Sequence, residues 1–336
     1  MKFLFSKSSS VLALLLLLSS VNTVNAQAVP VRNDVPRVGQ QEVIMMRHAY
    51  LEEGQYDYWK QESVNGVWPW FGRLGARMIG DFEVIYPLSD DETPGQDEAL
   101  RFARYASYEH WQATRRITAN NPTGGAIVLA GGGGLSDGSG AGLRNRGTVA
   151  QGSKEAVFLQ GYMAETRPIF MPGTGETFET TTGGSAADSP NPVALMAAQA
   201  NDEILALQYR RIKKGTFQEV YELSHDGLWP YLEKIGVRPV GQWKIAYLPA
   251  GTPIENIDYD EVYSLSRFAS LEHYEAINAS AVSLGGDGPD YDAAVRAFGL
   301  INQLTLESSV RFLKGPLFDS PPVYAPPVDA EYRIAN

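Results

Sequence analysis

Four histidines give this chain its acid–base groups near neutral pH: His48, His110, His225 and His273. His110 and His273 hold the same place in an internal repeat, since each stands three residues after a serine suited to cap a helix. Imidazoles at that place would polarise a substrate oxygen or ligate haem iron. The structural alternative is that they tie the start of the helix to a neighbouring strand. A helix N-terminus favours the neutral imidazole in either case.

Two arginines, Arg104 and Arg267, also coincide in the repeat, and each ends a predicted strand. Each shares its strand face with apolar or aromatic residues two and four positions earlier. There an arginine would clamp a carboxylate or enolate oxygen of a substrate. The alternative is that the side chain reaches the surface, or pairs with Glu109 or Glu272 in the following helix. Together with His110 and His273, these arginines are the candidate catalytic residues.

The candidate substrate-binding residues are His48, Tyr209, Trp68 and Trp229. His48 and Tyr209 coincide in the repeat, each on a strand face that also carries apolar residues. They would contact a ligand if that face lines a pocket, but both faces carry apolar residues, so the sequence leaves the inward face open. Trp68 and Trp229 each precede a proline. They would stack on a ligand, or lie in the core and set a helix kink.

The sequence lacks the common motifs for metal and phosphate binding. The Gly-rich run 131–142 does not end in Gly-Lys-Ser/Thr, so a mobile loop or lid is a better interpretation than a phosphate loop. There is no cysteine and no His-Glu-x-x-His. We therefore predict no metal site and no cofactor, with haem on His110 or His273 as the alternative.

Composition indicates a globular protein of 336 residues, with 44% hydrophobic and 20% charged residues. A net charge of −11 argues against a nucleic-acid partner, which requires a basic surface. The segment 1–26 is typical of a secretory signal peptide, with two lysines, an apolar run at 11–18 and small residues before the cleavage point. Cleavage would follow Ala26 or Ala28. We expect an exported protein, periplasmic or extracellular, without membrane insertion because the apolar run is too short to span a bilayer.

The chain contains a duplication. Ser63–Tyr86 aligns without gaps on Ser224–Tyr247, with eight of 24 positions identical, and Ala103–Ala113 aligns on Ser266–Ala276, with six of 11 identical. Such a repeat predicts one folding unit used twice.

Each copy has the pattern β-α-β-β-α-β. The predicted elements are a strand (43–50 and 204–212), a helix interrupted at Gly-x-Trp-Pro, a second strand (82–86 and 243–247), a third (99–105 and 261–268), a helix opening at Ser107 or Ser270, and a closing strand within 156–173 or 298–315. We predict an α+β fold of two tandem ferredoxin-like units that form a pseudo-dimeric α/β barrel.

The predicted domain boundaries follow from the repeat and from composition. They are the signal peptide 1–26, an extended leader 27–41, a first repeat 42–176 with a Gly-rich insertion 123–147 outside the barrel, a linker 177–198, a second repeat 199–319 and a Pro-rich tail 320–336.

Three segments of the second repeat, at 208–217 (QYRRIKKGTF), 236–243 and 266–273 (SRFASLEH), resemble the NIPSNAP family of the dimeric α/β-barrel superfamily. The chain would be a tandem-repeat, secreted form. The resemblance implies two units packed sheet against sheet around a small-molecule pocket. Similar scaffolds include cofactor-free oxygenases, EthD-like proteins, haem-degrading monooxygenases and chlorite-dismutase-like haem enzymes. The resemblance transfers a scaffold and no catalytic residue.

We therefore expect an exported protein that binds a small aromatic or oxygenated organic molecule. If it is an enzyme, the resemblance favours a cofactor-independent oxygenase or isomerase-type activity. Two alternatives stay open: a non-catalytic protein-interaction module, and a haem-binding monooxygenase or peroxidase-like enzyme. The expected partner is a small-molecule ligand, and homo-oligomerisation stays open as well.

Overall fold

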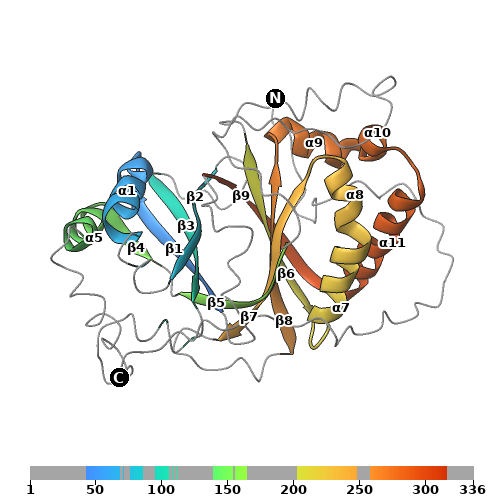
Figure 1. The fold of residues 1–336 in the computed structure, drawn as a ribbon, viewed down its shortest axis with the longest axis horizontal. Helices are drawn as coiled ribbons and strands as arrows, with labels where there is room; N and C mark the ends of the chain where they lie inside the picture. The colour runs from blue at the N-terminus through green and yellow to red at the C-terminus, as the bar shows by residue number, and fades with distance from the viewer. Residues whose placement is uncertain are drawn as a thin grey trace. The chain divides into compact units, whose positions relative to one another are not determined.

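The computed structural model describes residues 43–68, 71, 76–85, 95–105, 108, 111, 139–153, 156–164, 203–247 and 258–315 (Figure 1). They form two compact units. The first unit holds the described residues up to 164 together with 243–247 and 312–315, and the second holds 203–242 and 258–311. The predicted signal peptide, leader, linker and tail lie outside the described residues.

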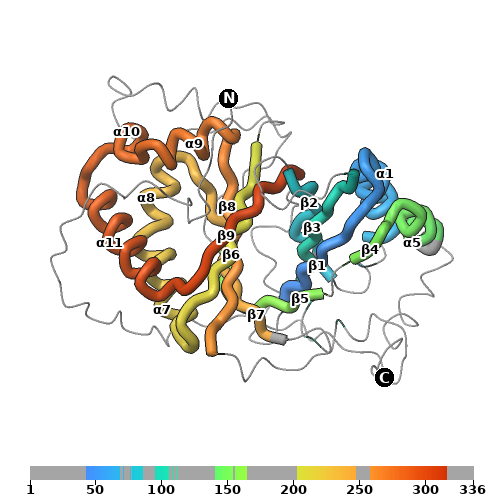
Figure 2. The backbone as a smooth tube through the Cα atoms, turned by 180° about the vertical axis from the view of Figure 1, so that it is seen from behind, coloured from blue at the N-terminus to red at the C-terminus, as the bar shows by residue number. Residues whose placement is uncertain are grey.

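The second unit has a four-stranded antiparallel sheet in the order β9-β6-β8-β7. Its elements are β6 (Ile204–Lys213), α7 (Phe217–Glu222), the π-helix η3 (Leu223–Leu228), α8 (Trp229–Lys234), β7 (Arg238–Tyr247), β8 (Tyr259–Phe268), α9 (Leu271–Ser280), α10 (Val282–Gly285), α11 (Pro289–Leu304) and β9 (Thr305–Lys314). The last residues of β7 and β9 belong to the first unit. Figures 1 and 2 show α7, α8 and α11 on one side of β6 and β8. The closing strand predicted within 298–315 is confirmed as β9, and residues 298–304 belong to α11.

The first unit repeats this arrangement. Its elements are β1 (Val43–Glu52), α1 (Tyr56–Glu62), the π-helix η2 (Ser63–Val67), β2 (Arg77–Val84), β3 (Gln96–Tyr105), α5 (Ser139–Thr148), β4 (Ala150–Ser153) and β5 (Val157–Met163). Strand β1 pairs with β3 on one side and with β4 and β5 on the other, and β2 pairs with β3. The order β2-β3-β1-β5 is that of the second unit, so the predicted α+β class with two ferredoxin-like units is confirmed.

In the first unit, the odd-numbered residues of β1 pack against the helices. Two buried clusters show this: one holds Ala49, Leu51, Tyr56, Trp59, Ala99 and Val149, and the other holds Val43, Met45, Ala76, Ala103, Tyr105, Tyr108 and Phe158. Because side chains alternate along a strand, the even-numbered residues of β1, including His48, lie on the opposite face of the sheet from the described helices of this unit.

The predicted helix interruption at Gly-x-Trp-Pro is confirmed in both units as a π-helical turn. Near the start of each turn a serine hydroxyl donates to the carbonyl four residues earlier: Ser63 Oγ to Trp59 O, and Ser224 Oγ to Val220 O, both at 2.8 Å. Such bonds compete with the helix ladder and bend it. Pro230 follows in α8 and has no N–H to donate.

The glycine of the same motif lets another helix approach closely in each unit. A Cβ on Gly227 would lie 2.6 Å from the Cβ of Ala297 in α11, and a Cβ on Gly142 of α5 would lie 3.0 Å from the Cα of Gly66. Helix α5 contains the last residues of the Gly-rich insertion, a segment expected to be a loop or lid. The structure shows instead that residues 139–148 form a helix packed against η2.

Candidate functional site

Tyr209, the candidate binding residue on the sheet of the second unit, lies on the face opposite the described helices. Gln242 marks the helix-covered face, because its amide donates to Ser224 Oγ of η3 at 3.3 Å and to Ser264 Oγ of β8 at 3.0 Å. Tyr209 is opposite Tyr263 in the β6–β8 register and both are odd-numbered, one position out of phase with Ser264. Tyr209 therefore points to the other face.

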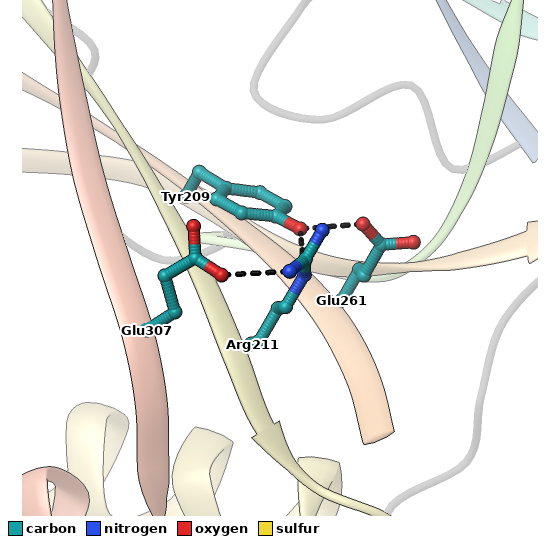
Figure 3. Close-up of polar contacts among 4 residues, drawn as sticks. All are labelled: Tyr209, Arg211, Glu261 and Glu307. Carbon is teal, nitrogen blue, oxygen red and sulfur yellow. Dashed lines mark hydrogen bonds and ion pairs between the residues drawn. The ribbon is translucent and has the colours of Figure 1, made fainter. Parts of the chain in front are cut away.

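A hydrogen-bonded group on this face, the Tyr209 cluster, consists of Tyr209, Arg211, Glu261 and Glu307 (Figure 3). The Tyr209 hydroxyl donates to Glu261 Oε1 at 2.5 Å and accepts from Arg211 Nε at 2.9 Å. Arg211 Nη1 also donates to Glu307 Oε2 at 2.7 Å. One phenolic oxygen thus lies between a carboxylate acceptor and a guanidinium donor.

Two further tyrosines extend the Tyr209 cluster. The Tyr263 ring lies 5.2 Å from that of Tyr209, and the Arg211 guanidinium lies 4.8 Å above the Tyr259 ring. All three tyrosines are half-buried, and the side chains of Arg211 and Glu307 are 38% and 57% exposed. Aromatic area and hydrogen-bonding groups are therefore both accessible on this face.

Both central tyrosines are neutral phenols at physiological pH. Burial raises the pKa of Tyr209, and its hydrogen bond to Glu261 raises it further. Burial, with the nearby Glu261 charge, raises the pKa of Tyr263 to about 12. They are therefore suited to donate hydrogen bonds to a ligand and not to remove a proton from it.

The first unit carries a histidine–glutamate pair at the equivalent positions. His48 Nε2 is hydrogen-bonded to Glu98 Oε2, and both side chains are only 6% exposed. In the repeat His48 aligns with Tyr209, and Glu98 aligns with Glu261. His48 and Tyr209 are among the residues predicted from the sequence, and Glu98 and Glu261 are not.

The surroundings of the two pairs differ. The apolar residues around His48 are buried: Ile44, Met46, Leu100 and Phe102 are each 7% exposed or less. The imidazole also lies against the Tyr50 ring, with 4.7 Å between ring centroids. The equivalent face of the second unit is more polar and more exposed.

Arg104 and Arg267 are both buried and lie at equivalent positions, opposite Ile44 and Leu205 in their ladders. Arg267 forms a buried ion pair with Glu203, whose pKa burial raises to about 7 although the arginine lowers it. Glu272, the other partner considered for Arg267, is exposed at the start of α9, whereas Arg267 is 1% exposed.

His273 is 1% exposed and has both ring nitrogens bonded to the backbone. Ala269 N donates to Nδ1 at 3.1 Å, so Nε2 carries the proton and donates to Ile235 O at 2.7 Å. Burial lowers the pKa of His273 to about 4. The predicted N-cap is confirmed, since Ser270 Oγ accepts from His273 N. The geometry of His273 ties α9 to the end of α8, as in the structural alternative, and His110 lies outside the described residues.

The two tryptophans are core residues in their units, with Trp68 8% and Trp229 4% exposed. Trp229 packs edge-on against Tyr221 at 5.8 Å and against His225 at 5.7 Å between ring centroids. Their position beside the π-helical turns matches the alternative of a core residue at the helix interruption.

Within the described part of the chain, no group of three or more His, Asp or Glu side chains is placed to hold a metal ion. None of the helices that the structure describes is long and apolar enough to cross a membrane.

No protein-family model matches this chain, and no curated protein is similar to it. A proposed monooxygenase of Fusobacterium nucleatum is similar in structure at 8% identity, over 82% of this chain and 92% of that one, with a TM-score of 0.44. An anthrone oxidase-like protein has 9% identity over 83% and 92% of the two chains, with a TM-score of 0.42. A NIPSNAP family protein of unknown function from Agrobacterium tumefaciens has 16% identity over 38% and 98%, with a TM-score of 0.26. Similarity at this level assigns no family, so the resemblance to NIPSNAP proteins stays a prediction.

Proposed function

We propose that this chain is an exported, NIPSNAP-like protein whose second unit binds a small aromatic or oxygenated organic molecule. The observation that carries the proposal is the Tyr209 cluster with the rings of Tyr259 and Tyr263 beside it. Small-molecule sites combine apolar and aromatic contact area with a few polar groups that fix orientation. This sheet face offers both.

Several ligating groups of the cluster remain available. Among the described residues, Arg211 Nη2, Glu261 Oε2 and the Tyr263 hydroxyl have no hydrogen-bond partner. Arg211 Nη2 can donate a hydrogen bond, Glu261 Oε2 can accept one, and the Tyr263 hydroxyl can do either. An oxygenated substituent of a ligand would be oriented by them while its ring packs on the tyrosines.

Three other candidate residues have a structural role in this proposal. His273, Trp68 and Trp229 belong to the framework, since they are buried and His273 is bonded through both nitrogens. Binding requires no cofactor here: iron ligation by His273 would break one of its two ring hydrogen bonds. If the protein is an enzyme, the carboxylate-bound imidazole of His48 is the group to examine for proton transfer.

Isothermal titration calorimetry with a panel of aromatic alcohols, acids and ketones tests the proposal on the full chain. We expect saturable binding by at least one compound, weakened at least fivefold by Arg211→Leu and by Tyr263→Leu. His225→Ala is the matched control: His225 is 37% exposed, pairs with Asp226 and lies on η3, away from the Tyr209 cluster. Absence of binding across the panel, or equal weakening by the control, would contradict the proposal. A specific protein partner would then favour the interaction module.

A further inference from the structure

We infer that the ligand of the second unit is an uncharged phenol, recognised through its hydroxyl group. This inference rests on the proposed function and specifies its substrate class. It comes from two observations: the balance of charge in the Tyr209 cluster, and the way the cluster already binds one phenol, the side chain of Tyr209.

Among the described residues, the charges around the tyrosines of this face are balanced. Arg211 is paired with Glu307, and Glu261 and Arg311 both act on Tyr263 with opposite signs. Arg311 and Glu307 are four residues apart on β9 and so share a face. Lys213, the remaining cation on this side of β6, lies at the exposed end of the strand.

This balance disfavours a charged ligand. An aromatic carboxylate beside Tyr209 would meet Glu261 and Glu307 as well as the guanidinium groups. An aromatic ammonium ion would meet Arg211 and Arg311. Either charge would lose hydration without a net countercharge, and desolvating an uncompensated charge is costly. A neutral ligand avoids that cost.

The hydrogen bonds of Tyr209 specify the group that would be recognised. Its hydroxyl gives a proton to Glu261 and receives one from Arg211. Glu261 Oε2 and Arg211 Nη2, which have no partner among the described residues, repeat this pairing of acceptor and donor, and a ligand hydroxyl placed between them would satisfy both. A methyl ether or a ketone offers only an acceptor, which would leave the carboxylate oxygen unpaired.

Four probes that share one ring test this inference: 4-methylphenol, 4-methylanisole, 4-methylbenzoate and 4-methylbenzylammonium, titrated calorimetrically into the full chain at pH 7. We expect the phenol to bind at least tenfold more tightly than either charged probe and at least fivefold more tightly than the ether. Glu261→Gln should weaken phenol binding at least threefold and improve benzoate binding. Tyr263→Phe removes one hydroxyl only and should weaken phenol binding about threefold. His225→Ala is again the control, and thermal unfolding shows that each variant is folded.

The outcomes separate this inference from the proposed function. Tighter binding of the benzoate or the ammonium probe, or equal binding of phenol and ether, would overturn the phenol assignment and leave the proposed function standing. The same holds if all four probes fail while another aromatic compound binds in an Arg211-dependent way. If no aromatic compound binds, both the phenol assignment and the proposed function are wrong.

Discussion

Asp81 lies directly opposite Arg101 in the β2–β3 ladder, and both side chains are buried. Neither carboxylate oxygen of Asp81 has a hydrogen-bond partner among the described residues. In the second unit the equivalent positions are held by Gln242 and Ser264, which are hydrogen-bonded to each other. At this position the first unit therefore has an acid–arginine pair, and the second unit has a hydrogen-bonded neutral pair.

Replacing Asp81 by Asn should stabilise the protein above pH 7. Burial raises the pKa of Asp81 to about 7 despite the attraction of Arg101, whereas the unfolded chain releases this proton near pH 3.8. The folded state therefore binds more protons between those values, and wild-type stability falls as pH rises from about 4 to 7. We expect Asp81→Asn to gain of order 1–4 kcal/mol at pH 8 and almost nothing at pH 4. Urea unfolding at both pH values measures this, and Asp226→Asn is the exposed control. A loss of stability at pH 8 would show that the Arg101 attraction outweighs burial.

Replacing His273 by Gln should have the opposite dependence on pH. Burial lowers the pKa of His273 to about 4, and the unfolded histidine titrates near 6.5. The unfolded state binds more protons between those values, so wild-type stability falls as pH drops from about 6.5 to 4. We expect His273→Gln to be less stable at pH 7 by about 1–3 kcal/mol, because a buried hydrogen bond is lost, and to show a flatter response at acid pH. Ligand affinity should not change. A marked drop in affinity in a folded variant would instead place His273 in the site.

Gly227→Ala should destabilise the second unit. The added methyl group would lie 2.6 Å from Ala297 Cβ, and overpacking of this kind costs about 1–3 kcal/mol. Ala297→Gly opens the space again, so the double variant should be more stable than the sum of the two single changes predicts, by at least about 1 kcal/mol. Chemical unfolding of all four proteins gives this coupling. If the changes in unfolding free energy of the two single variants add exactly, α11 accommodates the added methyl group without cost.

The purified exported protein should be colourless. Both ring nitrogens of His273 are hydrogen-bonded to the backbone, and the sequence has no Cys-x-x-Cys-His motif for haem attachment. The absorbance spectrum checks this directly. A Soret band that disappears in His110→Ala or His273→Ala would make a haem enzyme the leading interpretation.

The exported chain should begin at Gln27 or Val29, following cleavage after Ala26 or Ala28. Intact mass measurement of the protein from the periplasm or the medium distinguishes the two. A mature chain that still carries Met1 would argue against export through this signal.

Much of the fold follows from the duplication, because two copies of a pattern reinforce each weak signal. The strands and the helix interruption were predicted in both repeats and are confirmed. The aligned blocks Ala103–Ala113 and Ser266–Ala276 do not reach Glu98 and Glu261. The same offset, extended six residues toward the N-terminus, aligns Asp97-Glu98 with Asp260-Glu261.

The sequence could not predict which sheet face the helices cover. On β6 the helix side carries Gln208 and Arg210, while the other side carries Leu205 and Leu207. Polarity therefore does not separate the two faces. The partner of Arg267 was also unpredictable, since Glu203 stands just before β6, and only the strand register brings it near the end of β8.

The packing of α5 on η2 changes where this protein can be shortened. An insertion rich in glycine suggests deletion of the whole segment. Removing residues 123–147 would also take away Gly142 and Arg146, which donates to Ser63 Oγ at the π-helical turn. A chain shortened within 123–138 should therefore be more stable than one shortened through 147, because only the first keeps the packing of Ser139–Thr148 on η2.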